Sequence, residues 1–302
     1  MTRTTTNLLL MLFTVLGGTY AFITFCSECG AVEEAPIVKE EVLAPPVPEA
    51  TSYPFAFKSG DYAYDVNDNF NFNMSSSAIL APLSQKVEGG IISLKAFLTE
   101  NTDKAINITG YYKNNETNSS AFPNLGLARA NAVKNYLVSK EIPSIQINTM
   151  GELAESMVAK DHIFLGPIAY DLATKSVDAD AELKALYEKI KTDPLVLYFE
   201  TGEASINLTA AQRQKIADIS RYLDKVEEAT TMVIGHTDNV GLRSSNVALG
   251  QGRADFAKTY LIENGIPETR IQTTSEGPDT PIANNTTEEG RSKNRRTVIT
   301  LN

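Results

Sequence analysis

A polar stretch in the last third of the chain carries residue types that could hold the charged groups of a ligand. Asp238 follows an apolar run that ends near Gly235, and Arg253 stands 15 positions after Asp238. A carboxylate holds a cation, and a planar guanidinium holds a carboxylate through two parallel hydrogen bonds. The residues alone leave a structural alternative open, in which Asp238 forms an Asx turn and Arg253 is its salt-bridge partner.

The rest of the sequence does not indicate catalytic or metal chemistry. The chain contains no HExxH, SxxK or GxSxG motif. Its two histidines, His162 and His236, have no second His or Cys near enough in sequence to form a metal site. Both cysteines, Cys26 and Cys29, lie ahead of the globular part. We therefore expect a protein that is not an enzyme and that uses no metal and no cofactor.

A strand, a loop and a helix must position the two charged residues. Asp238 is expected to end a strand and begin a loop, whereas Arg253 lies two turns into the next helix. That helix can pack back over the strand and bring Arg253 beside Asp238. Gly235 and Gly241 would allow tight turns that leave backbone N–H groups free for a ligand.

The region that contains this site has an earlier counterpart in the chain. Residues 125–152 recur as residues 249–276 at a constant offset of 124. Eleven identities without a gap exceed what composition allows, so we interpret the chain as two copies of one domain. The identical pairs are Leu125/Leu249, Gly126/Gly250, Arg129/Arg253, Ala130/Ala254, Tyr136/Tyr260, Leu137/Leu261, Ile142/Ile266, Pro143/Pro267, Ile147/Ile271, Thr149/Thr273 and Glu152/Glu276.

Both copies show the same order of elements. An extended apolar segment comes first, followed by a helix, a strand ending at a glycine, a loop, a second helix and another strand. This alternation predicts an α/β fold, an α+β sandwich with helices on one face of the sheet. The helices are expected at about 84–100, 124–140, 209–227 and 245–264, with Thr209 as an N-cap, and a connecting amphipathic helix at 179–191.

Four motif pieces carry a family resemblance. GHTDNVG, NVALGQGRA, a turn from Gly277 to Pro281 and NNTTEEGRSKNRR occur in this order over about 110 residues. The sequence here closely resembles the OmpA-like peptidoglycan-binding domain. The resemblance implies two tandem βαβαβ domains with a mixed sheet, and recognition of the diaminopimelate side chain of the peptidoglycan stem peptide.

The resemblance also assigns roles to individual residues. It implies that Asp238 takes the ammonium of diaminopimelate and Arg253 takes the carboxylate, so that one fixed anion and one planar cation meet a zwitterion. Thr237 and Asn246 are short polar residues that would support the pocket. Further supporting residues are expected at Thr201, Gly241, Leu249 and Arg296, whereas the remaining arginines from Arg291 onward should pair with loop carbonyls or with Glu288 and Glu289.

The first copy departs from this pattern. Lys113 stands where the second copy has Asp238, although Arg129 is retained and corresponds to Arg253. A lysine cannot hold an ammonium group, so this copy should not bind the same ligand in the same way. We expect residues 60–175 to be a degenerate copy that contacts a protein partner or a second copy of the chain.

The N-terminal segment predicts a membrane location. Residues 7–25 carry no charged side chain and follow Arg3. As a helix they span roughly 28 Å, close to the ~30 Å hydrocarbon core of a bilayer. Charge placement favours an uncleaved inner-membrane anchor with the globular part in the periplasm. The alternative is a signal segment cleaved near Ala21, with release to the periplasm or outer membrane.

Composition restricts the remaining partners. The net charge is −10 and no basic block occurs outside the C-terminal tail, which argues against nucleic acid. Expected partners are peptidoglycan and, through residues 7–25, a membrane. The expected divisions are an anchor or signal segment at 1–30, a Pro/Glu-rich linker at 31–59, the degenerate copy at 60–175, a connecting helix at 176–192 and the peptidoglycan-binding copy at 193–302.

These features predict a non-enzymatic envelope protein that tethers peptidoglycan to a membrane. An alternative is a passive anchor subunit of a larger inner-membrane complex, whose OmpA-like domains bind protein partners. A flagellar stator subunit fits less well, because a proton path requires an ionisable residue within the span and residues 7–25 have none.

Overall fold

The computed structural model describes residues 3–26, 50–176, 178–263 and 265–302. The chain divides into two units, residues 1–47 and residues 48–302, and each is described by itself. Most of the expected linker, together with Cys29, lies outside the described residues.

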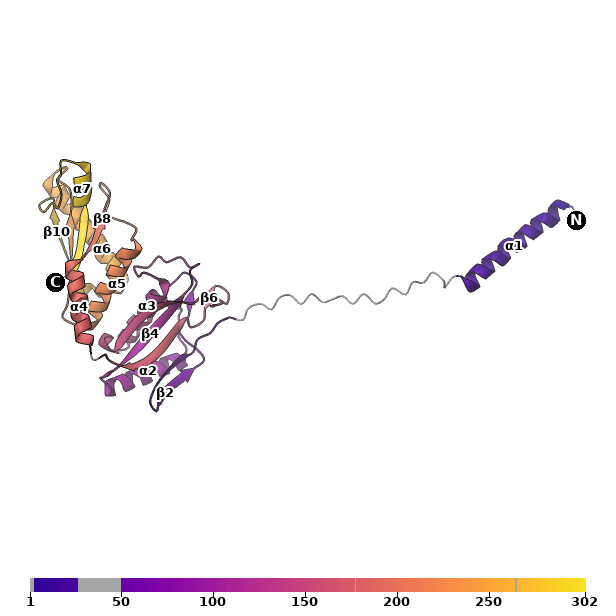
Figure 1. The fold of residues 1–302 in the computed structure, drawn as a ribbon, viewed down its shortest axis with the longest axis horizontal. Coiled ribbons are helices and arrows are strands. Elements are labelled where there is room, and N and C mark those ends of the chain that lie inside the picture. The colour runs from indigo at the N-terminus through magenta and orange to yellow at the C-terminus, as the bar shows by residue number, and fades with distance from the viewer. Residues whose placement is uncertain (1–2, 27–49, 177, 264) are drawn as a thin grey trace. The chain divides into compact units, whose positions relative to one another are not determined.

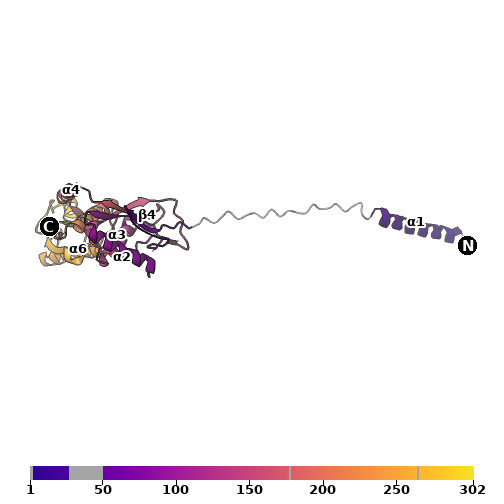
Figure 2. The same cartoon turned by 90° about the horizontal axis from the view of Figure 1, so that it is seen from below.

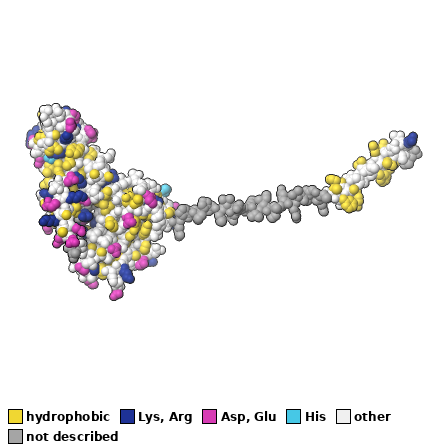
Figure 3. All heavy atoms as spheres, viewed as in Figure 1, with side chains coloured by type: hydrophobic (Ala, Val, Ile, Leu, Met, Phe, Trp, Pro, Cys, Tyr) yellow, Lys and Arg dark blue, Asp and Glu magenta, His cyan; other side chains and the backbone are white. Residues whose placement is uncertain are grey.

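Helix α1 (Arg3–Phe25) is the described part of the first unit apart from Cys26. It has 23 residues, a mean hydropathy of 2.0 and no buried side chain, and Figure 3 shows hydrophobic side chains along its surface. Hydroxyls of Thr14, Thr19 and Thr24 donate to carbonyls four residues earlier, so these polar groups are satisfied without water. By length and composition α1 could cross a membrane, although a signal sequence passes the same test.

The first copy is built on a three-stranded sheet. Strand β4 (Lys104–Tyr112) is central, parallel to β5 (Ile147–Leu153) and antiparallel to β7 (Ile168–Thr174). Helices α2 (Gln85–Glu100) and α3 (Leu125–Ser139) lie beside this sheet (Figures 1 and 2). Their apolar side chains share one buried core with it. Smaller elements surround them: β1 (Phe55–Ser59) paired with β2 (Tyr62–Val66), β3 (Phe72–Asn73) paired with β6 (Ile163–Phe164), and η1 (Ser144–Gln146).

Two boundaries in this copy differ from those predicted. Residues 55–59, expected to belong to the linker, form β1, and both Phe55 and Phe57 are buried in the core of the first copy. Strand β4 continues to Tyr112, two residues beyond the glycine at which it was expected to end. Aromatic packing accounts for β1, because the Phe55 ring contacts those of Tyr64 on β2 and Tyr170 on β7.

The second copy is built on a mixed four-stranded sheet in the order β10-β9-β11-β8. Strands β9 and β10 are parallel, and β11 is antiparallel to both β9 and β8. Helices α4, α5 and α6 share one hydrophobic core with the sheet, which confirms the predicted α/β class. The bounds are α4 (Ala179–Thr192), β8 (Leu195–Tyr198), α5 (Ala210–Lys225), β9 (Thr231–His236), α6 (Arg243–Glu263), η2 (Glu268–Arg270), β10 (Ile271–Gly277), α7 (Glu288–Asn294) and β11 (Arg296–Leu301).

Local signals account for the positions of the helices. Thr209 is the N-cap of α5, and its side chain and that of Gln212 form a reciprocal capping box. Helix α4 covers the range predicted for a connecting helix, and its Leu186 and Ile190 pack into the core of the second copy.

The two copies contact each other directly within the second unit. Lys134 of α3 forms an ion pair with Asp224 of α5, and only 4% of the Lys134 side chain is exposed. The Ser144 hydroxyl donates to the carbonyl of Asp224 at 2.7 Å, and the Lys225 ammonium donates to the carbonyl of Ile147 at 2.6 Å. Polar bonds between α5 and the first copy therefore hold the two copies together.

Candidate binding site

The site forms where α6 crosses β9 at unusually short range. A Cβ atom added at Gly235 would lie 1.8 Å from the carbonyl oxygen of Gly250. Only glycine permits this approach, which brings α6 at Gly250 against the end of the strand. The tight turn expected at Gly235 is therefore wrong, because this residue lies within β9 and serves helix packing. Gly241 does occupy a turn, with φ +96°.

Asp238 lies just after β9, next to the end of the parallel strand β10. The backbone N–H of Thr237 donates to the carbonyl of Gly277 at 2.8 Å, which joins the two strand ends. Asp238 is 7% exposed, and its carboxylate accepts the Val240 N–H at 3.0 Å on Oδ1, an Asx turn. Its Oδ2 accepts Nη1 of Arg295 at 3.0 Å. Both carboxylate oxygens therefore point at donors within the fold, and each retains a free lone pair.

Arg253 lies on α6 and is fully buried. Its Nε donates to the carbonyl of Glu203 at 2.9 Å, Nη1 to that of His236 at 3.0 Å and Nη2 to that of Glu200 at 3.2 Å. The guanidinium also lies 5.1 Å from the centre of the Phe199 ring. Among the residues that the structure describes, no carboxylate pairs with it.

Electrostatics at the site follow from this arrangement. Burial and the neighbouring charge of Arg295 lower the pKa of Arg253 to about 10, and the charge of Asp238 opposes that shift. Burial also disfavours the charged form of Arg295, but its hydrogen bonds to Asp238 and Glu288 raise its pKa above the ordinary value. Two buried guanidiniums thus flank one buried carboxylate, which leaves the site receptive to a further negative group.

The other predicted residues divide into two groups. Thr237 and Asn246 are buried beside Asp238: the Thr237 hydroxyl donates to the carbonyl of Asp238, and the Asn246 amide donates to that of Val240. They fix the loop between β9 and α6. For the remaining residues the structure gives no hydrogen bond to Asp238 or Arg253: Thr201 lies in an exposed turn after β8, Leu249 is half-buried on α6, and Arg296 donates to the carbonyl of Thr280 at 3.1 Å.

Arg295 is the site residue that the sequence did not reveal. It was expected to be structural and to pair with Glu288 or a loop carbonyl, and it does donate to Glu288 and to the carbonyl of Phe199. Its bond to Asp238 joins residues 57 positions apart, and that pairing has no signal in local spacing. The repeated arginines of the NRR motif were the only available indication.

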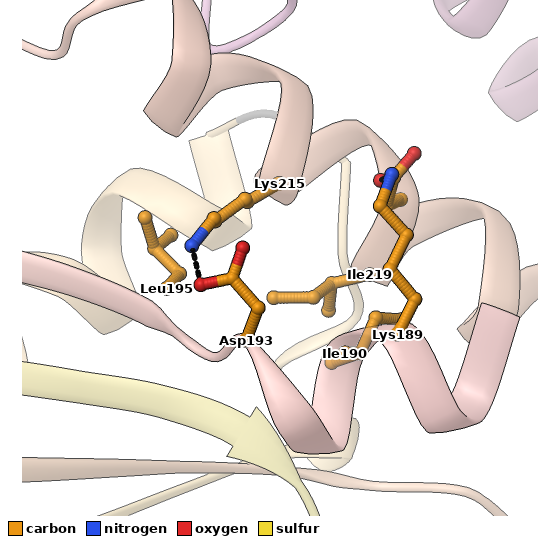
Figure 4. Close-up of a pocket in the computed structure, with 7 residues that line it drawn as sticks. Lys189, Ile190, Asp193, Leu195, Lys215 and Ile219 are labelled. Atoms are coloured by element: carbon orange, nitrogen blue, oxygen red, sulfur yellow. Dashed lines mark hydrogen bonds and ion pairs between the residues drawn. The ribbon is translucent and has the colours of Figure 1, made fainter.

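A large open hollow adjoins the site, whereas a second cavity is too small for a ligand. The hollow measures about 690 Å³ and is bordered by Arg295, Phe199, Glu200 and residues of the loop before α5. Figure 4 shows the small cavity between α4 and α5, with a volume of about 10 Å³, room for roughly one water molecule. There Lys215 donates to Asp193 at 2.5 Å. Within the described ranges, no three His, Cys, Asp or Glu side chains gather to hold a metal ion.

The fold and site define a class, tandem α/β sandwiches with a buried arginine at the carboxyl ends of two parallel strands. A family model gives the particular family. The OmpA family matches residues 71–162 and 198–295, more than half of the sequence, and the chain belongs to the OmpA family.

Individual relatives match one part of the chain at a time. A probable lipoprotein of Escherichia coli, YiaD, is 38% identical over 98 residues, which covers 32% of this chain and 45% of the relative. The peptidoglycan-associated lipoprotein of Buchnera aphidicola is 36% identical over 112 residues, or 37% of this chain and 63% of the relative. The peptidoglycan-binding protein ArfA of Mycobacterium tuberculosis is 30% identical over 122 residues, or 40% and 36%.

The chain thus spans less than two thirds of the length of these curated relatives. Among solved structures, the crystal structure of the peptidoglycan-associated lipoprotein from Burkholderia pseudomallei is similar, with 24% identity and a TM-score of 0.33. That match covers 35% of this chain and 89% of the other. None of these relatives is named as an enzyme.

Proposed function

We propose that this chain is a non-enzymatic envelope protein that binds the diaminopimelate-containing stem peptide of peptidoglycan through residues 193–302. Membership of the OmpA family supports the proposal, as do the names of two relatives, a peptidoglycan-associated lipoprotein and a peptidoglycan-binding protein. The proposed divisions remain the anchor or signal segment, linker, degenerate copy, connecting helix and binding copy. The linker now ends before β1 at residue 55.

The unfilled hydrogen-bonding capacity of Arg253 carries the proposal. A guanidinium has five N–H donors, and the structure gives three bonds to Arg253, all to backbone carbonyls. Nη1 and Nη2 therefore each retain one N–H group. Two such groups on one planar fork match a carboxylate, which accepts both in parallel. A buried cation without a carboxylate partner gains most from a ligand that supplies one.

Asp238 offers the complementary half of the site. Its two oxygens can accept about four hydrogen bonds, and the structure fills one on each oxygen. An ammonium group could therefore bind Asp238 without displacing Arg295. Because Arg295 and the Val240 N–H fix the carboxylate in place, the ligand would not have to order it on binding. A zwitterion such as the free end of diaminopimelate satisfies both halves together.

Helix α1 supplies the proposed membrane attachment. Its uncharged residues 7–25 and its internally bonded threonine hydroxyls suit a hydrocarbon environment. We place the helix in the inner membrane and the second unit in the periplasm. Binding by this unit would then hold the membrane and the cell wall together.

Co-sedimentation with peptidoglycan tests the proposal. The full-length chain in detergent is mixed with sacculi of the diaminopimelate type and, in parallel, of the lysine type. The parent should pellet with the first type, and free diaminopimelate should release it. Asp238→Asn and Arg253→Lys should each weaken binding by about 10- to 100-fold, or roughly 1.5–3 kcal/mol. The first removes the charge that holds the ammonium, and the second keeps its charge but loses the planar fork that holds the carboxylate.

A matched control separates site chemistry from net charge. Arg243 lies on the same helix as Arg253, but its side chain is 69% exposed and pairs with Asp279. Arg243→Ala removes a positive charge near the site and should leave binding unchanged. Thermal melting establishes that each variant is folded. A parent that stays in the supernatant would refute the proposal and make a protein partner the leading alternative.

A further inference from the structure

Arg129 of the first copy is held by the same scaffold as Arg253, but all five of its N–H groups are used. It is fully buried, and it donates to the carbonyls of Ser76, Tyr111 and Asn73 at 3.0, 2.8 and 3.5 Å. The two remaining N–H groups donate to Glu116. Nη1 meets Oε2 at 3.1 Å, and Nη2 forms an ion pair with Oε1. A carboxylate of this chain therefore occupies the fork.

The correspondence between the two copies extends to each carbonyl. Tyr111 follows Gly110 in β4 as His236 follows Gly235 in β9, and in both copies the arginine donates to the carbonyl of that residue. An aromatic ring, Phe72 or Phe199, lies beneath each guanidinium. The copies differ in the loop that follows the strand. It covers residues 113–124 in the first copy and the shorter range 237–242 in the second.

The longer loop carries Glu116, whose carboxylate is buried and hydrogen-bonded. The Glu116 side chain is 1% exposed and accepts hydrogen bonds from the backbone N–H groups of Ser75 and Lys113, each at 2.9 Å. Burial disfavours the charged form, but the bonds from Arg129, Ser75 and Lys113 outweigh it and hold the pKa of Glu116 below its ordinary value. The Lys113 ammonium is engaged elsewhere, with the carbonyl of Met157 at 2.8 Å.

We propose that the first copy contains a carboxylate-binding site that its own Glu116 fills. Arg129 and two loop N–H groups, those of Ser75 and Lys113, form the receptor, and the loop at 113–124 carries the occupant. Glu116 bound to Arg129 prevents an external carboxylate from binding there. Removal of the Glu116 side chain opens the site to a small monocarboxylate such as formate or acetate. No anionic partner for an ammonium stands at the Lys113 position, so a zwitterion gains nothing over acetate.

Carboxylate rescue of Glu116→Ala tests this inference in the full-length chain in detergent. The variant should melt at a lower temperature than the parent, because Arg129 is left buried without its counter-ion. Added sodium formate should raise its melting temperature saturably, whereas sodium chloride at equal ionic strength should not. At formate about 100 times above its dissociation constant, the ratio of folded to unfolded chain should rise about 100-fold.

Three comparisons make the test decisive. Glu116→Gln keeps the volume of the side chain, so it should block formate. Glu155→Ala removes a carboxylate that accepts the Asn114 N–H of the same loop but does not touch Arg129, and it should show no formate response. An equal response in the parent, or a Glu116→Ala variant that formate does not stabilise whether folded or not, would overturn the inference. No peptidoglycan is involved, so the outcome is independent of the proposed function.

Discussion

The crossing of β9 and α6 predicts a large effect from a single methyl group. In Gly235→Ala the new Cβ would lie 1.8 Å from the oxygen and 2.6 Å from the carbon of the Gly250 carbonyl, both backbone atoms. Since Cβ atoms essentially never approach closer than 3.0 Å, α6 must move away from the strand by more than 1 Å. Such overpacking costs about 1–3 kcal/mol.

Displacement of α6 also affects Arg253, which travels with the helix. Its three carbonyl bonds, of 2.9 to 3.2 Å, would lengthen, at a cost of about 1 kcal/mol each. The expected total is roughly 4–6 kcal/mol, or about 10 °C in melting temperature for a unit of this size. Peptidoglycan binding should fall as well, because the guanidinium fork moves away from Asp238.

Two glycine variants serve as controls in thermal melting and co-sedimentation. Gly252→Ala on the open side of α6 meets no atom within 4 Å, and helix propensity should stabilise it by about 0.5–1 kcal/mol. Gly110→Ala repeats the clash in the first copy, at 2.0 Å from the Gly126 oxygen, and should destabilise the fold without weakening peptidoglycan binding by a folded protein. A Gly235→Ala variant that melts within about 1 °C of the parent would refute this reasoning.

Two further predictions concern buried charge. Burial, followed by the charge of Arg296, lowers the pKa of His236 from 6.5 to about 4. Between pH 6.5 and pH 4 the unfolded chain therefore binds more protons than the folded chain. The free energy of unfolding should fall by up to about 3 kcal/mol as the pH drops through this range. His236→Gln should remove this part of the pH dependence in urea unfolding, and an unchanged profile would contradict the assignment. Asp224→Ala should lower the free energy of unfolding by roughly 3 kcal/mol, because it leaves the buried Lys134 ammonium without a counter-ion. Lys134→Met should lower it less, since Asp224 is partly exposed. Equal losses of stability in the two variants would contradict the role of burial.

Local and repeated features of the sequence predicted much of the fold. The offset of 124 residues identified two copies, and the structure builds both on a parallel strand pair that an antiparallel strand extends. The Thr209 cap and the apolar stripe after it placed α5 to within two residues at its C-terminal end. These signals depend on neighbours within one or two turns, which a single sequence displays directly.

Contacts between distant residues could not be predicted in this way. Phe55 and Phe57 stand beside a Pro/Glu-rich stretch and were grouped with it, but their burial depends on Tyr64 and Tyr170. Arg295 was placed in a structural cluster because nothing in its own neighbourhood points to Asp238. No sequence motif pointed to Glu116, because its role depends on a loop that is long in the first copy and short in the second.

The comparison of the copies changes what a mutation of the buried arginine can establish. Arg129 and Arg253 each donate to three backbone carbonyls, one in the preceding strand and two in the segment before the first helix of the same copy. Each is therefore part of the scaffold whether or not a ligand binds. Loss of peptidoglycan binding in Arg253→Lys could therefore reflect a disturbed scaffold.

Asp238→Asn is the more informative variant, because the amide oxygen can still accept one of the two internal bonds while the negative charge is lost. A folded Asp238→Asn protein that releases peptidoglycan would assign the ammonium contact to Asp238, and one that binds as tightly as the parent would leave Arg253 as the principal ligand group.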